Sequence, residues 1–312
     1  MATIFIDGQA GTTGIEIATR LRARDDLTLL NIAEDERKDP AAREKLFKQA
    51  DVAILCLPDD AAISACELAD GQCRLLDAST AHRTDTDWIY GLPELSPATR
   101  TAIATAERVS NPGCYPQGFI LSVLPLIEAG LLAANTPLRC YAVSGYSGGG
   151  RQMIESFQDF TATQADTFNT QAYGLTQSHK HLPEMQHYSG CAQAPIFLPT
   201  VAHYYKGMLV SVALFAEELN GATPEDVQRV LAQRYADEQF VNVAPVNATE
   251  SLVNGYLNPT ACNDTNELQL LVFGDNQRTV INARYDNLGK GASGAAVQNL
   301  NIMLGLKEDL GL

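Results

Sequence analysis

Three glycines follow one another at three-residue steps near the start of the chain, at Gly8, Gly11 and Gly14. They stand between an apolar run over residues 2–7 and a helical pattern that begins near Ile15. A strand that turns through glycines directly into a helix is the opening unit of a parallel α/β sheet. The same order of apolar run and helix-like segment then recurs, with apolar runs at residues 27–33, 52–57 and 75–78. The sequence therefore predicts an N-terminal α/β domain with a Rossmann-like parallel sheet.

The glycine segment has the spacing GxxGxxG, one residue longer between its first two glycines than the common dinucleotide fingerprint GxGxxG. Glycines let the backbone approach a pyrophosphate, and a helix N-terminus offers amide donors and the positive end of its dipole. A plain strand–turn–helix connection would also explain the glycines. Their place after the first strand of the chain favours a dinucleotide site, made by Gly8, Gly11, Thr12, Thr13 and Gly14.

A charged segment after the second predicted strand bears on the choice of nicotinamide cofactor. Glu34 lies at about the distance, roughly 20 residues beyond the last glycine, where an acidic residue binds the ribose hydroxyls of NAD. Arg37 and Lys38 follow it and would instead suit the 2′-phosphate of NADP. The residues alone leave both cofactors open.

The segment Ser110-Asn111-Pro112-Gly113-Cys114-Tyr115-Pro116 holds a cysteine in a turn stiffened by proline and glycine. Pro116 suits the first residue of a helix running towards Gly130. Because a helix N-terminus stabilises negative charge, a thiol there is expected to have a depressed pKa and to act as a nucleophile. A buried cysteine that only fills space is the alternative. The turn favours catalysis for Cys114.

A second segment, Ser178-His179-Lys180-His181-Leu182-Pro183-Glu184, places two histidines at the start of another predicted helix. Glu184 in its first turn would fix the tautomer of His181, which leaves the other ring nitrogen for proton transfer. The two histidines could also bind a metal, but no third ligand follows at a suitable spacing, so we expect no metal site. A nucleophilic thiol, a histidine and a nicotinamide site together fit hydride exchange with a thioester.

The remainder of the chain is less regular. Residues 84–112 look irregular, with prolines and glycines as punctuation, and the region after Cys114 has an α+β texture with predicted strands at 138–144, 207–215 and 268–273. A Gly/Ala-rich amphipathic helix is expected at residues 292–306.

Composition excludes several classes of function. The chain has 312 residues, 22 Lys and Arg against 37 Asp and Glu, and a formal net charge of −15. Such a balance argues against binding nucleic acid or anionic lipid. The seven cysteines contain no CxxC pair, no apolar run is long enough to span a bilayer, and MATIFIDG lacks the features of a signal peptide. We therefore expect a cytoplasmic enzyme or binding protein with reduced thiols.

Six segments of the sequence resemble the N-acetyl-γ-glutamyl-phosphate reductase family, in its short, type 2 branch. They are residues 8–14, YGLPEL at 90–95, NPGCYP at 111–116, SGYSGGG at 144–150, residues 179–184 and KGASGAAVQN at 290–299. The glycine segment is shared with aspartate-semialdehyde dehydrogenases, whereas NPGCYP and HxHxPE are more specific. One departure is visible, because a threonine is expected after CYP and this chain has Gln117.

The resemblance implies NADPH-dependent reduction of N-acetyl-γ-glutamyl phosphate to the semialdehyde, a step of arginine biosynthesis. It implies Cys114 as nucleophile, His181 as acid and base, and Glu184 as its orienting group. It also implies that the C-terminal helix returns to the first domain, with Gly291 and Gly294 near the cofactor, and that the protein forms a dimer or tetramer. The expected domains are a dinucleotide-binding domain at 1–113, an α+β catalytic and dimerisation domain at 114–290, and the returning helix at 291–312.

The substrate's phosphate and carboxylate need cationic or amide donors. Arg83 and Asn111 are the candidates for substrate binding, and Arg37 is the candidate for the cofactor's 2′-phosphate; Arg151 and Lys206 are weaker alternatives for substrate. Two other functions remain open at this point: an aspartate-semialdehyde dehydrogenase, and a redox-sensing dinucleotide-binding protein without catalysis.

Overall fold

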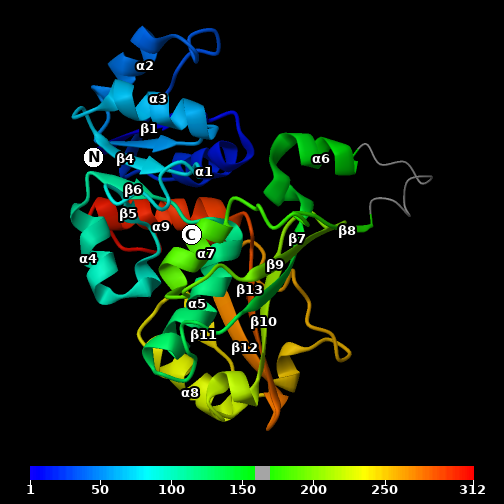
Figure 1. The fold of residues 1–312 in the computed structure, drawn as a ribbon. Helices are drawn as coiled ribbons and strands as arrows, with labels where there is room; N and C mark the ends of the chain where they lie inside the picture. Colours follow the sequence, from blue (N-terminus) through cyan, green and yellow to red (C-terminus); the bar gives the residue numbers. More distant parts are fainter. Residues whose placement is uncertain (159–168) are drawn as a thin grey trace. The chain divides into compact units, whose positions relative to one another are not determined.

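The computed structural model describes residues 1–158 and 169–312. The chain forms two compact units, and we describe each by itself (Figure 1). Unit 1 comprises residues 1–112 and 292–312, and unit 2 comprises residues 113–291.

Unit 1 is built on a six-stranded sheet with the strand order β2-β1-β3-β4-β6-β5. Every strand pair in this sheet is parallel, as the alternation of apolar runs and helices predicted. The strands are β1 (Ala2–Asp7), β2 (Leu27–Leu30), β3 (Val52–Leu55), β4 (Arg74–Asp77), β5 (Ile89–Tyr90) and β6 (Arg108–Ser110). The chain crosses from β2 over β1 to β3, so the strand order reverses there, and such a switch point is where open α/β sheets bind ligands.

Two clusters of buried side chains fix the helices to the two faces of this sheet. Ile4 and Ile6 of β1 point to one face, where they pack with α1 (Thr12–Arg22), α4 (Pro97–Thr105) and α9 (Gly294–Met303). Phe5 points to the other face, where the core includes residues of α3 (Asp59–Ala69) and Phe47 of α2 (Pro40–Phe47). This alternation follows from the two-residue period of a strand.

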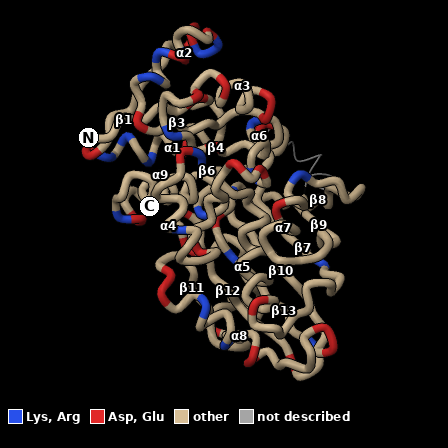
Figure 2. Tube along the Cα trace, turned by 60° about the vertical axis from the view of Figure 1, so that its left-hand side comes forward, with Lys and Arg blue, Asp and Glu red and all other residues tan. Residues whose placement is uncertain are grey.

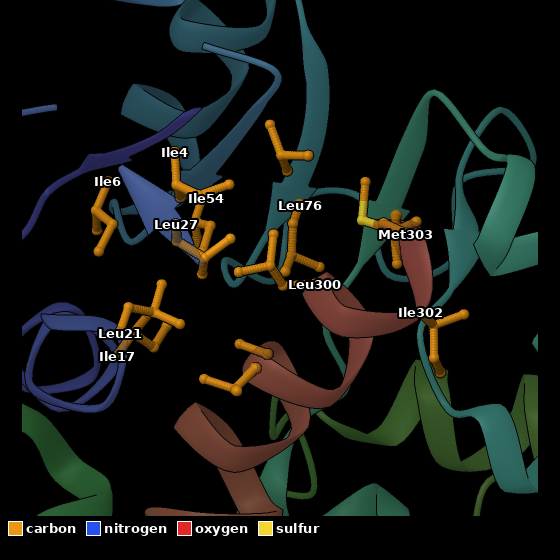
Figure 3. Packing of buried hydrophobic residues seen from close by; sticks show 14 of the residues in the cluster. Ile4, Ile6, Ile17, Leu21, Leu27, Ile54, Leu76, Leu300, Ile302 and Met303 are labelled. Carbon is orange, nitrogen blue, oxygen red and sulfur yellow. The ribbon is translucent and has the colours of Figure 1, made fainter. Parts of the chain in front are cut away.

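The C-terminal helix α9 belongs to unit 1. Leu300, Ile302 and Met303 join the cluster that contains Ile4 and Leu76 (Figure 3). The helix is shorter than the sequence suggested, because residues Gly289–Ser293 form a π-helical turn before α9 starts.

The expectation of irregular structure at residues 84–112 was wrong. This stretch contains β5, a 3-10 turn at Pro93–Leu95, α4 and β6. Ser96 caps α4 by accepting a hydrogen bond from the Thr99 amide, and Pro97 occupies its first turn. Serine before proline is a helix-start signal, so here the prolines mark a boundary rather than a loop.

Unit 2 carries a mixed seven-stranded sheet with the order β11-β12-β13-β10-β7-β9-β8. Its strands are β7 (Arg139–Gly145), β8 (Thr170–Ala172), β9 (Ile196–Ala202), β10 (Met208–Phe215), β11 (Val241–Val243), β12 (Leu268–Asp275) and β13 (Arg278–Tyr285). The pairs β7–β9 and β11–β12 are parallel and the others antiparallel, which is the predicted α+β texture.

The helices of unit 2 are α5 (Cys114–Glu128), α6 (Gly150–Gln158), α7 (Leu182–Ser189) and α8 (Pro224–Arg234). Short 3-10 turns lie at Tyr146–Gly149, Ala216–Leu219 and Thr249–Ser251. Helix α5 is buried along most of its length and contacts β10, β13, α7 and α8. Gly130 follows this helix with φ +72°, as predicted for the residue after a helix end. In the described part of the chain, no helix has both the length and the apolar content needed to cross a membrane.

Candidate functional site

The glycine turn of unit 1 is shaped by two glycines that admit no side chain. Gly8 has φ +85°, and a Cβ there would lie 2.3 Å from the Cys56 carbonyl oxygen after β3. A Cβ on Gly14 would lie 2.6 Å from the Gly8 carbonyl oxygen, whereas one on Gly11 would meet only ordinary contacts. The turn therefore lies at the switch point between β1 and β3, and Gly8 and Gly14 allow it to pack closely against neighbouring backbone.

Helix α1 begins immediately after this turn, at Thr12, with Gly11 as its N-cap. Gly11 offers no side-chain cap, and the first turn carries no acidic residue. The amides of Thr12 and Thr13 therefore have the geometry that binds a phosphate at a helix N-terminus. This cradle fits the pyrophosphate of a dinucleotide.

An ion pair that the sequence analysis missed lies beside the turn. Asp7, the last residue of β1, is buried, and its Oδ2 lies 2.6 Å from Nη2 of Arg43 on α2. Burial raises the pKa of Asp7, and Arg43 opposes part of that rise. Arg43 stands in a segment of α2 where acidic and basic residues alternate (Figure 2). Arg37, by contrast, is exposed and lies 3.5 Å from the exposed Glu34, so both candidates for cofactor choice sit together at the surface.

Arg83 and Asn111, the candidates for substrate binding, are brought together in unit 1. The buried Arg83 donates from Nε to the Asn111 carbonyl oxygen at 3.0 Å and from Nη2 to the Ala78 carbonyl oxygen at 3.1 Å. Asn111 in turn accepts from Asn299 and donates to the Ala292 carbonyl oxygen, both in the C-terminal segment.

A cluster after β4 fixes the loop that carries Arg83, and sequence reasoning did not find it. The buried Asp77 accepts from the Ser79 hydroxyl at 2.6 Å and lies 2.7 Å from Nδ1 of His82. The His82 ring stacks on Trp88 with centroids 4.3 Å apart. The loop is thereby held rigidly around the arginine.

In unit 2, Cys114 is the first residue of α5, with Gly113 as N-cap. The helix thus begins two residues earlier than the proline suggested, which puts the half-buried thiol inside the first helical turn. The Gly113 amide donates to Oε2 of Glu184 at 2.9 Å, so a carboxylate of the second motif holds the entrance of the cysteine helix.

His181 is the N-cap of α7, and Glu184 lies in the first turn, as the position of Pro183 predicted. The buried His181 ring lies 5.8 Å from the ring of Tyr115, the neighbour of Cys114, and 4.8 Å from the His179 ring. The structure therefore brings the two motifs together, while the orienting role of Glu184 towards His181 stays a prediction.

His179 has a structural partner of its own. Its Nδ1 accepts from the His181 amide at 3.2 Å. Burial, with a smaller effect of Lys180, lowers the pKa of His179 to about 4. This ring is therefore neutral near pH 7 and supports the backbone of His181.

Tyr173 and Tyr285, which carry no sequence signal, lie close enough to Cys114 to be affected by its charge. Tyr173 donates from its hydroxyl to the Tyr115 hydroxyl at 2.9 Å. Burial raises the pKa of Tyr115, Tyr173 and Tyr285, and the negative charge of Cys114 adds to each rise. The three phenols are therefore within electrostatic range of the thiolate.

Of the remaining predicted residues, Gly291 lies beside Cys114, and the others have different surroundings. A Cβ on Gly291 would lie 3.1 Å from Cβ of Cys114, so Gly291 packs directly against the nucleophile candidate, whereas Gly294 opens α9 in unit 1. Gln117 is buried and donates to the Lys290 carbonyl oxygen at 2.9 Å. Lys206 forms ion pairs with Asp264 and Asp286, and Arg151 is exposed. Among the described residues, no group of histidine, cysteine and acidic side chains is arranged to hold a metal ion.

Comparison with known proteins agrees with this geometry. Residues 3–103 match the family described as "Semialdehyde dehydrogenase, NAD binding domain", and residues 114–287 match "Semialdehyde dehydrogenase, dimerisation domain". Among solved structures, the aspartate semialdehyde dehydrogenase of Francisella tularensis is similar with a TM-score of 0.74 and 14% identity, covering 97% of this chain and 100% of that one. That of Candida albicans, solved with NADP, has a TM-score of 0.66 and 13% identity over 97% and 98% of the two chains. At such identity the likeness shows the fold.

Sequence relatives are much closer. A protein of Nostoc sp. named N-acetyl-gamma-glutamyl-phosphate reductase 2 is 50% identical, covering 99% of this chain and 98% of that protein. A Burkholderia lata protein named N-acetyl-gamma-glutamyl-phosphate reductase is 46% identical, covering 97% and 96%. With such identity over almost its whole length, the chain belongs to the N-acetyl-γ-glutamyl-phosphate reductase family of oxidoreductases.

Proposed function

We propose that this protein reduces N-acetyl-γ-glutamyl phosphate to N-acetylglutamate semialdehyde with NADPH and releases phosphate, as a cytoplasmic step of arginine synthesis. The observation that carries the proposal is the hydrogen bond from the Gly113 amide to Glu184, which joins the cysteine helix to the histidine helix. Family membership supplies the substrate, and a nucleophilic thiol requires a reducing compartment such as the cytoplasm.

In the first half of the reaction, the Cys114 thiolate attacks the acyl carbon of the substrate. The first-turn amides of α5 stabilise the oxyanion that forms, because a helix N-terminus directs its donors outwards. The bond between the acyl carbon and the phosphate oxygen then breaks. Phosphate leaves, and the acyl group remains on Sγ as a thioester.

In the second half, bound NADPH supplies the hydride that converts the thioester to a thiohemiacetal. His181 gives a proton to the developing oxyanion and takes it back as the C–S bond breaks and the aldehyde leaves. Glu184 keeps the Gly113 amide, and with it the start of α5, fixed during both steps. The thiolate is regenerated at the end.

The cofactor is assigned to unit 1 and the acyl chemistry to unit 2. Gly8, Gly11, Thr12, Thr13 and Gly14 would hold the pyrophosphate, because the start of α1 has no side-chain cap and no acidic residue and presents the positive end of its dipole. Arg37 would bind the 2′-phosphate of NADP, with Gly291 and Gly294 on the nicotinamide side. Arg83 and Asn111 would bind the substrate's anionic groups.

We further propose that the protein is a homo-oligomer whose contact includes the exposed apolar face of the unit 2 sheet. Tyr141 on β7 pairs in register with Leu198 on β9, and Ile196 extends the same row. These three side chains are 49%, 42% and 53% exposed. Apolar side chains gathered on one sheet face are typical of an interface between subunits.

The decisive assay runs the reaction backwards. We expect reduction of NADP that requires both N-acetylglutamate semialdehyde and phosphate, and loss of nearly all of it in Cys114→Ser, which should still bind NADPH as measured by fluorescence. Activity with aspartate semialdehyde but not with N-acetylglutamate semialdehyde would support the rival dehydrogenase. No turnover with either semialdehyde would leave the redox-sensing function. Repeating the assay with NAD decides the cofactor.

A further inference from the structure

Tyr285, the last residue of β13, places its hydroxyl against the first turn of α5. The hydroxyl donates to the Cys114 carbonyl oxygen at 2.6 Å and accepts from the Gly118 amide at 3.1 Å. Cys114 and Gly118 are residues i and i+4 of the helix, so their carbonyl and amide form the first helical pair after the N-cap. One phenol hydroxyl therefore bonds both groups that set the geometry of the thiol-bearing turn.

Gly118 provides the space that this contact needs. A Cβ at position 118 would lie 2.8 Å from the Tyr285 hydroxyl oxygen, 2.9 Å from its Cε1 and 3.0 Å from Cβ of Ala283. Glycine weakens a helix relative to alanine, so Gly118 makes α5 less stable than alanine at this position would. A helix start with only a structural role would not need a glycine here. The missing side chain admits the tyrosine hydroxyl.

The opposite contact on Cys114 comes from the π-helical turn. A Cβ on Gly291 would lie 3.1 Å from Cβ of Cys114, and the Gly291 amide donates to the Asp286 carbonyl oxygen at 2.8 Å. Tyr285 and Gly291 are only six residues apart in the chain. Tyr285 contacts the carbonyl of Cys114, and Gly291 packs against its Cβ. A single short segment, from the end of β13 to the π-helical turn, therefore contacts both the backbone and the side chain of Cys114.

Tyr285 keeps its proton over the working range of pH. It is completely buried, and burial, with a smaller effect from the charge on Cys114, raises its pKa well above the ordinary value. The ionisable groups that act on Tyr285 or lie beside the start of α5 include Cys114 and Cys140, Tyr115 and Tyr173, and His181 and Glu184 at the start of α7. The phenol thus acts as a fixed neutral donor among them.

We propose that Tyr285 is a positioning residue for the Cys114 nucleophile. Its hydroxyl holds the first turn of α5 so that Sγ keeps its angle of attack and the first-turn amides keep their direction towards the thiolate and the oxyanion. This role rests on the proposed function, in which Cys114 forms the thioester. Tyr285 itself contacts no reacting atom.

The test compares Tyr285→Phe with a matched control, Tyr235→Phe. The buried Tyr235 hydroxyl also donates to a carbonyl of α5, that of Leu121, at 2.7 Å, but two turns further along the helix. Both variants lose one hydroxyl-to-carbonyl bond on the same helix, and Tyr285→Phe also loses the bond that the hydroxyl accepts from the Gly118 amide. Three quantities are measured in each: the thermal midpoint, kcat and KM of the reductase reaction, and the alkylation rate of Cys114 by iodoacetamide as a function of pH, followed by mass spectrometry.

We expect a lower thermal midpoint for both variants, with a somewhat larger fall for Tyr285→Phe because it loses two hydrogen bonds. Only Tyr285→Phe should lower kcat, by roughly tenfold or more with KM changed much less, because misplacing a reacting group by about 1 Å costs up to a hundredfold. It should also move the alkylation midpoint to higher pH, by about half a unit, since hydrogen-bond donors to a thiolate favour the charged form. Equal kinetic effects in the two variants, or an unchanged alkylation profile in Tyr285→Phe, would overturn the proposal.

Gly118→Ala provides a second test that does not remove the hydroxyl. Alanine favours the helix but displaces Tyr285, so kcat and the alkylation midpoint should shift in the same direction as in Tyr285→Phe. Unchanged values in a folded Gly118→Ala protein would count against the proposal. Because alkylation uses no substrate, it decides the role of Tyr285 even if the wild-type protein shows no reductase turnover, a result that would refute the proposed function alone.

Discussion

Cys114 differs from the other cysteines in its surroundings. Burial raises the pKa of Cys56 and Cys66 to about 12 and that of Cys73 and Cys262 to about 11, and it also raises the pKa of Cys140 and Cys191. These six thiols stay protonated near neutral pH, and a protonated thiol is a poor nucleophile. Cys114 is half-buried like Cys56, Cys66 and Cys73, but it differs from them in lying at a helix N-terminus. That this position makes Cys114 the reactive thiol stays a prediction.

The first prediction follows from that difference. At about pH 8, one equivalent of iodoacetamide should label Cys114 well before any other cysteine, because the thiolate fraction sets the rate. Peptide mass spectrometry after short exposure measures the labelled positions, and Cys114→Ser serves as the control that should remain almost unlabelled. Early labelling of Cys66 or Cys73 would contradict the prediction.

A second residue-scale prediction concerns His179. Its pKa falls to about 4 in the folded protein from its ordinary value of 6.5, so between these values the unfolded chain binds more protons than the folded one. Stability therefore rises with pH across this window and is lost as the pH falls through it. In His179→Asn, whose amide oxygen can still accept from the His181 backbone, urea midpoints should depend less on pH between about 4 and 6.5 than in the wild type. An equal pH dependence in both proteins would show that other groups cause it.

At the scale of elements, Arg74 of β4 ties two helix ends together. It donates to the carbonyl oxygens of Ala106, Ala104 and Ile103 at 2.8, 3.0 and 3.3 Å, at the end of α4, and also to that of Met303 at the end of α9. A cation at a helix C-terminus satisfies carbonyls that the helix itself leaves without donors. The C-terminal helix is thereby joined to the sheet by a polar contact as well as by its apolar face.

Arg74→Met should lower the free energy of unfolding by about 2 to 3 kcal/mol, because buried carbonyls lose a charged donor. Arg108→Gln on the neighbouring β6 is the matched control. It removes only an exposed ion pair with Asp70, worth less than about 1 kcal/mol. Denaturant titration of both variants measures the difference, and equal losses would refute the assigned role of Arg74.

The elements also show where reasoning from the sequence is strong. Strands β1, β3 and β4 and the start of α7 were predicted to within a few residues, because their signals are local: an apolar run, a glycine turn, a proline in the first helical turn. The helix α4 was missed because three prolines and a glycine nearby suggested a loop, and α5 starts at Cys114 before its proline because Glu184 and Tyr285 hold its first turn. Those two partners are distant in sequence and leave no local signal.

At the scale of the whole molecule, a net charge of −15 does not exclude the binding of small anions that we propose. Positive potential is concentrated at helix N-termini and at a few arginines such as Arg83, which local hydrogen bonds hold in place. An acidic surface is unfavourable for binding polyanions. The apolar row on the unit 2 sheet is where we propose the contact between subunits.

Leu198→Glu should therefore weaken self-association, because it places a charge in the middle of that apolar row. Tyr256→Glu is the control, since Tyr256 is 76% exposed but lies outside the sheet strands. Analytical ultracentrifugation measures the mass of each variant, and we expect a smaller species only for Leu198→Glu. A wild-type protein that is already monomeric at high concentration would refute the proposed interface.

By itself, the sequence determined the parallel sheet, the glycine turn, the cysteine and histidine motifs and the family, because each depends on residues close together in the chain. Only the tertiary structure decided which groups surround the thiol. The Glu184 contact joins residues 71 apart, and the Tyr285 contact joins residues 171 apart. No periodicity or spacing encodes such pairs, since they form only when β13 and α7 pack against α5. A local motif is thus enough to predict Cys114 as the nucleophile. The groups that hold the first turn of α5 come from distant segments that only the fold brings together.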